Sequence, residues 1–123
     1  MVNLFIYGSF MRGHINHKYL KGYSCCKAIL RGYRRSWPRA KDTAILVKNN
    51  VSSITGELYW NITNKDLEKI DHLHGTPHNY THKNVEVILL ENKKPVSAII
   101  YAPTDDIIKQ WLLIEKKEQI VKD

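Results

Sequence analysis

Long apolar runs are absent from this sequence, and several residue types are scarce. No stretch approaches the roughly 18–20 consecutive apolar residues that a membrane-spanning helix needs. The opening residues, MVNLFIYGSF, have no charged segment ahead of a short apolar run, so they do not resemble a secretory signal peptide. We therefore expect a soluble, cytoplasmic protein without a membrane partner.

Cysteine is among the scarce residues, with only Cys25 and Cys26 in the chain. Adjacent Cα atoms lie about 3.8 Å apart, whereas disulfides usually need at least about 4.4 Å. The two thiols cannot easily bond to each other, which fits a reducing compartment. We expect two free cysteines that point to opposite faces of a strand.

Acidic residues are fewer than basic ones, 12 against 19, and the formal net charge is +7. Such a charge attracts anions and nucleic acids. The basic residues are spread along the chain except in the run RGYRRSWPRAK, residues 31–41, which mixes them with aromatic rings as single-strand binders do. A nucleic-acid-binding module is therefore an alternative, although we do not expect nucleic acid to be the partner.

Short β-prone apolar runs dominate the chain and are separated by turn residues. Gly56 interrupts one of them and predicts a bulge or a close backbone approach. The segment KNN predicts a turn, and ENKKP predicts a hairpin between the last two runs. Strands are expected at residues 2–7, 25–33, 43–47, 54–60, 85–90 and 96–101.

The period changes after residue 62. Thr63 is a good helix N-cap, and Asp66 follows three residues later, close to a capping box. Leu67, Ile70 and Leu73 then recur at a helical spacing, which predicts one apolar face.

This helix is expected to end within IDHLHG, residues 70–75, because glycine suits the left-handed position after a helix. A last helix is expected to open at Thr104. The order of long β stretches and segregated helices predicts an α+β fold, with a strongly curled, mixed and largely antiparallel sheet or small barrel and a packed helix. No linker or repeat divides the chain, so residues 1–123 are interpreted as a single domain.

Five sequence pieces in register carry a resemblance to a known family. They are LFIYGSFMRG, GYRRSWPRA, GELYW, IDHLHGTPHNY and AIIYA. Together they are similar to the gamma-glutamylcyclotransferase-like family, over roughly residues 2–102. No single piece is specific, but their order and spacing agree with the family pattern.

The resemblance implies a pocket for a small molecule, a γ-glutamyl or related compound. In the family the α-amine attacks its own γ-carbonyl, 5-oxoproline forms and an amine is released, a reaction of transferase or lyase type. The chemistry needs donors for the developing oxyanion and a base for the amine proton. The substrate-binding residues implied are Tyr7, Gly8, Ser9, Phe10 and Tyr101.

The family's catalytic glutamate lies in Asp-x-Leu-Glu-Gly, and here His74 occupies its position between Leu73 and Gly75. An imidazole can act as a base near neutral pH, so His74 is the candidate catalytic residue. The alternative is a member that has lost its base and binds a ligand without turnover. A second departure is His82, where the family commonly has arginine.

Histidines also crowd at residues 72–82, which raises the alternative of a metal site. Their spacing, H-x-H-x3-H-x3-H, matches no common zinc pattern, and no cysteine accompanies them. We expect no metal and no cofactor.

Overall fold

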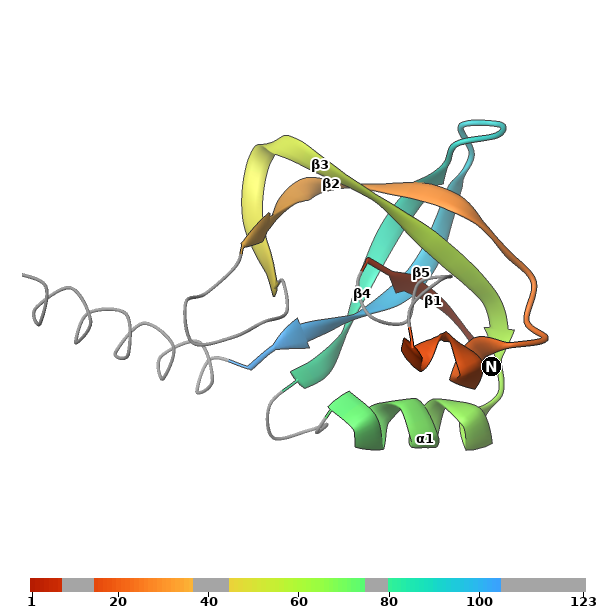
Figure 1. The fold of residues 1–123 in the computed structure, drawn as a ribbon. Coiled ribbons are helices and arrows are strands. Elements are labelled where there is room, and N and C mark those ends of the chain that lie inside the picture. The colour runs from red at the N-terminus through yellow and green to blue at the C-terminus, as the bar shows by residue number, and fades with distance from the viewer. Residues whose placement is uncertain (8–14, 37–44, 75–79, 105–123) are drawn as a thin grey trace, which may run out of the picture.

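The computed structural model describes residues 1–7, 15–36, 45–74 and 80–104 (Figure 1). The helical elements in these ranges are the 3-10 helix η1, Ile15–Leu20, and the α-helix α1, Asn64–His74. The strands are β1 (Val2–Ile6), β2 (Cys25–Ser36), β3 (Ile45–Ile62), β4 (Tyr80–Leu89) and β5 (Pro95–Pro103). The last helix predicted from Thr104 onward lies outside the described residues.

The described strands close into a barrel in the order β1-β3-β2-β4-β5. The pairings are antiparallel except for that between β1 and β5, which is parallel and joins Leu4 to Ile99. Figure 1 shows β2 and β3 running side by side over most of their length, with α1 across one side of the barrel. The α+β prediction of a curled mixed sheet with a packed helix is therefore confirmed, and the sheet is closed.

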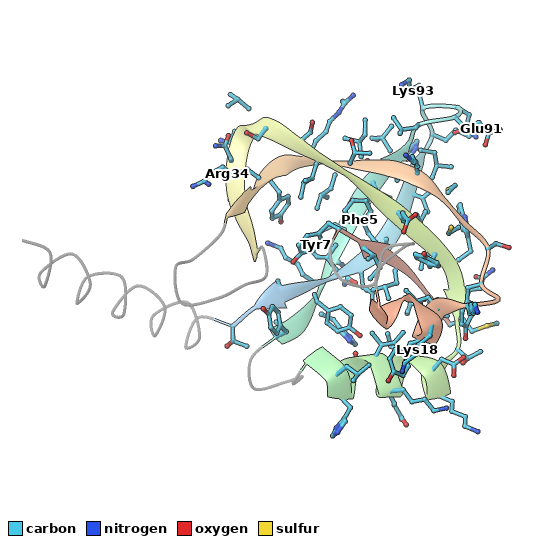
Figure 2. All side chains as sticks on the ribbon, in the orientation of Figure 1. Phe5, Tyr7, Lys18, Arg34, Glu91 and Lys93 are labelled. Atoms are coloured by element: carbon cyan, nitrogen blue, oxygen red, sulfur yellow. The ribbon has the colours of Figure 1, made fainter. Side chains whose placement is uncertain are left out.

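The inside of the barrel holds one of two apolar cores. Its buried residues come from all the strands of the barrel, and successive side chains of a strand point to opposite faces, so this set fills the interior. Figure 2 shows Phe5 within the ring of strands. The buried members are Phe5, Ala28, Leu30, Ile54, Leu58, Val87, Ala98 and Ile100.

The second core lies between the outer face of the barrel and the two helical elements. Ile70 of α1 and Leu20 of η1 are both fully buried there, against residues of β1, β3 and β5. Burying a side chain such as Ile70 contributes about 1.5–3 kcal/mol. This packing holds α1 against the barrel at the level where β1 and β5 carry Ile6 and Tyr101.

The two cysteines illustrate the separation of the cores. Cys25 packs against the outer core, and Cys26 packs against the barrel interior. Both are free thiols, and both are partly buried. The predicted placement on opposite faces of a strand is confirmed.

The third and fourth predicted strands are in fact one element, and the predicted turn at KNN is wrong. β3 runs continuously from Ile45 to Ile62 and pairs with β2 on both sides of that segment. The register shifts between Arg31 and Tyr33, where Gly32 has a φ of 86°. Glycine adopts this left-handed conformation at low cost, and opposite it β3 carries extra residues, because Arg31 pairs with Ser53 while Tyr33 pairs with Lys48.

The predicted helix face is correct in part. Ile70 is buried and Leu67 is partly buried, but Leu73 is 47% exposed. Each step of three residues rotates a side chain by about 300°, so Leu73 lies about 120° from Leu67 around the helix. The apolar face formed by these three residues therefore points away from the barrel in the last turn of α1.

Strand β4 begins five residues earlier than the sequence pattern indicates. It starts at Tyr80 rather than at residue 85, and Tyr80 pairs with Pro103 of β5. The first part of β4, YTHKN, is polar and carries no alternating apolar signal. The hairpin predicted at ENKKP is confirmed, since Leu89 N–H donates to Lys94 O at 2.9 Å.

Gly56 shows the predicted close backbone approach. A Cβ atom at this position would lie 2.3 Å from the Ile6 carbonyl oxygen and 2.7 Å from Phe5 Cζ. Such separations are far inside van der Waals contact. The absence of a side chain at Gly56 therefore lets β3 lie against β1 immediately before Tyr7.

Candidate functional site

Helix α1 is fixed at its start by the predicted cap. The Asp66 N–H donates to Thr63 Oγ1 at 3.2 Å, which satisfies one of the free amides of the first turn. The Tyr23 hydroxyl donates to the Asp66 carboxylate and also accepts from the Thr63 N–H at 3.3 Å. This links the helix start to the segment that leads into β2.

The same cap predicts a pH-dependent contribution to stability. The pKa of Asp66 lies below its ordinary value of 3.8, chiefly because of the Tyr23 hydrogen bond. A group with a lowered folded pKa contributes fully above its unfolded pKa, and that contribution is lost as the pH falls through the folded value. Asp66→Asn should therefore lower the urea midpoint near neutral pH and matter little in strong acid. An unchanging difference between the two proteins down to about pH 2 would contradict this.

A cluster of three side chains, Asp71, His82 and Tyr101, lies at the other end of α1. Asp71 lies in the last turn, and its Oδ1 accepts a hydrogen bond from the Tyr101 hydroxyl of β5. The same oxygen lies 2.6 Å from Nε2 of His82 on β4. His82 and Tyr101 also meet ring to ring, with centroids 5.3 Å apart and planes at 72°. Three elements thus converge on one carboxylate.

Tyr101 is the buried member of this cluster, with 2% of its surface exposed. Its pKa is raised well above the ordinary value of 10.0, first by burial and then by the hydrogen bond and negative charge of Asp71. Tyr101 is therefore a neutral hydrogen-bond donor throughout the physiological range.

Tyr7 connects the end of β1 to the same place. Its hydroxyl donates to the backbone oxygen of Tyr101 at 3.3 Å. Tyr7 and Tyr101 are both predicted substrate-binding residues, and the structure brings these two together. Figure 2 shows Tyr7 beyond Phe5 along the chain. The function of the pair stays a prediction.

The remaining predicted site residues lie at the border of the described ranges or beyond it. Gly8, Ser9 and Phe10 lie outside the described residues. His74 is the last residue of α1, one turn after Asp71, and its side chain is not among those described. Positions three apart on a helix are surface neighbours, so the backbone of His74 lies beside the Asp71 cluster. Its predicted meeting with residues 8–10 stays a prediction.

The pairing of His82 with Asp71 is not anticipated by the sequence pattern. In the sequence, His82 stands out as a member of the histidine cluster at residues 72–82 and as a position where the resemblance implies arginine. The polar start of β4 carries no strand signal, and a bond between a helix and a strand has no local sequence signature. The missed residue nevertheless contacts the same carboxylate oxygen as Tyr101, at 2.6 Å.

Glu57 is a second residue whose position the sequence does not reveal. It is a buried carboxylate on β3, 8% exposed, opposite Ile6 of β1. The Tyr59 hydroxyl donates to Glu57 Oε1 at 3.2 Å. The pKa of Tyr59 is raised, first by burial and then by the charge of Glu57. Glu57 therefore lies on the strand beside the end of β1, near Tyr7.

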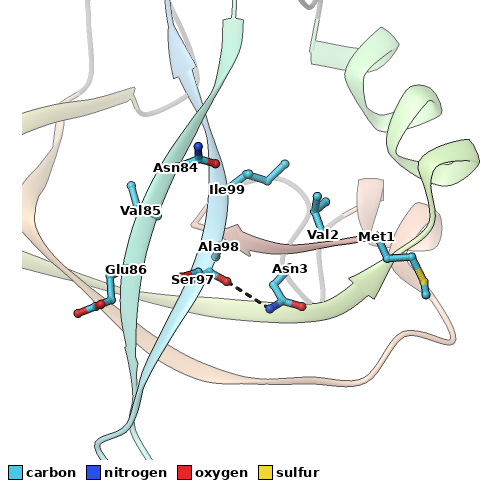
Figure 3. Close-up of a pocket in the computed structure, with 9 residues that line it drawn as sticks. All are labelled: Met1, Val2, Asn3, Asn84, Val85, Glu86, Ser97, Ala98 and Ile99. Carbon is cyan, nitrogen blue, oxygen red and sulfur yellow. Dashed lines mark hydrogen bonds between the residues drawn. The ribbon is translucent and has the colours of Figure 1, made fainter.

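A hollow of about 600 Å³ lies elsewhere on the barrel (Figure 3). It surrounds the start of β1, where the Asn3 side-chain amide donates to the Ser97 backbone oxygen at 3.2 Å. Tyr7 is at the other end of β1, so the hollow and the Asp71 cluster are different places. Its lining residues are Met1, Val2, Asn3, Asn84, Val85, Glu86, Ser97, Ala98 and Ile99.

The alternatives of a nucleic-acid surface and a metal site concern residues that the structure describes in part. Arg31 and Arg34 are exposed on β2, and Figure 2 shows Arg34 on the outer end of the strand; the rest of the basic run extends beyond the described side chains. Within the described ranges, no group of three His, Cys, Asp or Glu side chains could hold a metal ion.

In the same ranges, no helix is long and apolar enough to cross a membrane.

The closed barrel with a helix across one side defines a class of protein for which related structures exist. An AIG2-like protein of Mus musculus has a TM-score of 0.74 and 21% identity, over 91% of this chain and 82% of that one. A protein of Arabidopsis thaliana, solved in solution, has a TM-score of 0.70 and 21% identity, over 98% and 87%. These similarities show the fold.

The sequence itself matches the family described as "Gamma-glutamyl cyclotransferase, AIG2-like" over residues 4–119. A Methanocaldococcus jannaschii protein, provisionally named a gamma-glutamylcyclotransferase, is 35% identical over 105 residues, 82% of this chain and 83% of its own. Protein AIG2 A of Arabidopsis thaliana is 29% identical over 107 residues, 85% of this chain and 62% of its own. The chain belongs to the gamma-glutamyl cyclotransferase, AIG2-like family.

Proposed function

We propose that this chain binds a γ-glutamyl compound beside Asp71 and converts it to 5-oxoproline with release of an amine. The observation that carries the proposal is the cluster itself. Tyr7, Asp71 and Tyr101 come from three motifs far apart in sequence, and hydrogen bonds join them at one end of α1. The family name and the archaeal relative supply the reaction class.

The reaction requires mainly that the protein position the substrate and transfer protons. The α-amine and the γ-carbonyl belong to one substrate molecule, so holding it folded brings them within reach. The neutral Tyr101 hydroxyl already donates to Asp71, which fixes that carboxylate toward β5. Tyr7–Phe10 is the proposed binding segment for the carbonyl, since a glycine such as Gly8 allows close approach of the backbone to a ligand and backbone N–H groups stabilise an oxyanion.

His74 is the proposed base, because it occupies the position of the family's catalytic glutamate. A neutral imidazole can accept the proton of the attacking amine near pH 7. The alternative is a member that binds the γ-glutamyl compound without cyclising it. The imidazole of His74, at a position where the sequence resemblance implies a carboxylate, favours this alternative.

An assay with paired substrates tests the proposal. The protein is expected to release 5-oxoproline from a γ-glutamyl amide of a simple amine, and none from the matching α-glutamyl amide. The α-isomer has the same atoms but no γ-amide to be displaced, so it controls for contaminating peptidases. Thermal shift on the same compounds separates turnover from binding alone: stabilisation without product supports the binding-only alternative, and neither stabilisation nor product contradicts both.

A further inference from the structure

The cluster at Asp71 contains an imidazole that the motif comparison does not assign. His82 lies on β4, opposite Tyr101 of β5 in the strand register. Its Nε2 is 2.6 Å from Asp71 Oδ1, and its ring meets the Tyr101 ring. His82 is thus held on two sides, by a carboxylate from α1 and by an aromatic ring from its neighbouring strand.

This anchoring leaves His82 accessible. The side chain is 34% exposed, whereas Tyr101 beneath it is 2% exposed. With Nε2–H donating to Asp71, Nδ1 is the nitrogen left to exchange a proton with another molecule. A carboxylate that bonds one imidazole nitrogen fixes the ring orientation, which is what a proton-transfer residue requires.

The charges around His82 suit a proton donor. Asp71 supplies a negative charge beside the ring, which compensates the positive charge of an imidazolium. The neighbouring cation, Lys83, points to the other face of β4, with its ammonium 5.3 Å from the centre of the Tyr33 ring. The strand therefore separates Lys83 from His82.

We propose that His82 is the general acid that protonates the leaving amine. This assignment rests on the proposed function. The bond from the α-nitrogen to the γ-carbon forms, and the bond from the γ-carbon to the leaving nitrogen breaks. The proton of the attacking amine passes to His74, and the leaving nitrogen takes a proton from His82 Nδ1. One proton moves through solvent from His74 to His82 afterward, so no other reactant is consumed.

Two substrates that differ in leaving group test this role. A γ-glutamyl methylamide must release an amine, which needs a proton. A γ-glutamyl phenyl ester releases phenolate, which leaves without one because a phenol ionises near pH 10. His82→Gln is expected to lower kcat about 100-fold or more on the methylamide and less than about tenfold on the phenyl ester. Spontaneous cyclisation of the ester is subtracted as the rate without protein.

Companion variants make the result specific. Asp71→Asn should show the same preference for the ester, because it removes the charge that orients and compensates the ring. His72→Gln is the matched control: His72 is an exposed histidine in the same turn of α1, and its variant should keep both rates. Thermal midpoints identify any variant that has lost its fold.

Each other outcome counts against the assignment. Equal losses on both substrates in folded His82→Gln would show a general structural effect and overturn the acid role. Wild-type rates on the methylamide would overturn it as well. A wild-type protein that turns over neither substrate contradicts the proposed function itself, and the assignment falls with it.

Discussion

His74→Gln is expected to lower the rate of 5-oxoproline formation by about 100-fold or more, while His74→Glu keeps or raises it. The two replacements are similar in size, but only glutamate can accept a proton. Glutamate is also the residue that the sequence resemblance implies at that position. The contrast therefore isolates proton transfer from the space that the side chain fills.

The position of His74 supports this expectation. It is the last residue of α1, and Asp71 precedes it by one turn on the helix. The packing of Ile70 against the barrel fixes the helix directly before both residues. A replacement at the helix end should leave the fold intact, because it does not alter the packing of Ile70 that holds the helix against the barrel.

The measurement is kcat on a γ-glutamyl amide as a function of pH. An imidazole base should make the wild-type rate rise through about pH 6.5, and a glutamate base should move that rise to about pH 4. Equal rates for wild type and His74→Gln would show that His74 is not the base. Turnover in His74→Glu from a wild type that has none would support the alternative of a member that has lost its base.

The local features of this fold could be predicted from the sequence because neighbouring residues determine them. Thr63 and Asp66 form the cap that their spacing predicts. The five motif pieces predicted the family, and short β-prone apolar runs located most strands. Gly56 indicated a close approach because an isolated glycine within a strand commonly marks a bulge or a nearby backbone.

Features that depend on distant residues could not be predicted in this way. The continuity of β3 follows from its pairing with β2 on both sides of KNN, which the turn-like composition conceals. The contact between His82 and Asp71 requires both the start of β4 and the end of α1 to be in place. Leu73 fitted the helical spacing of apolar residues. It is nevertheless exposed, because the direction in which α1 packs on the barrel determines which side chains are buried.

The candidate site shows the same division. Tyr7 and Tyr101 were named through motifs, and the structure joins them through a hydrogen bond. No local pattern connects either residue to His82. The buried carboxylate of Glu57 was visible only as one charged residue in an apolar strand.

Gly56→Ala is expected to destabilise the protein by about 3 kcal/mol or more, which corresponds to a fall in Tm of about 10 °C or more. The new Cβ would lie 2.3 Å from the Ile6 carbonyl oxygen. A side chain can rotate away from such a contact, but a backbone oxygen in a paired strand cannot. β1 or β3 would have to shift, and the pairing of Ile6 with Glu57 would loosen.

The same shift should reach the candidate site, because Tyr7 directly follows Ile6. Gly56→Ala is therefore expected to weaken binding of a γ-glutamyl compound even below its unfolding temperature. Val51→Thr is the stability control: Val51 is 95% exposed on the same strand, and this replacement keeps a β-branched side chain. Its unfolding free energy should stay within about 0.5 kcal/mol of wild type.

A double variant distinguishes the backbone contact from the side-chain contact. Phe5 Cζ would lie 2.7 Å from the new Cβ, so Phe5→Leu removes that second clash. The clash with the Ile6 oxygen remains, and Phe5→Leu also removes buried atoms, so Gly56→Ala combined with Phe5→Leu should be at least as unstable as Gly56→Ala alone. Urea unfolding of the four proteins in this cycle measures the coupling. Recovery of wild-type stability in the double variant would show that Phe5, rather than the backbone of β1, sets the requirement for glycine.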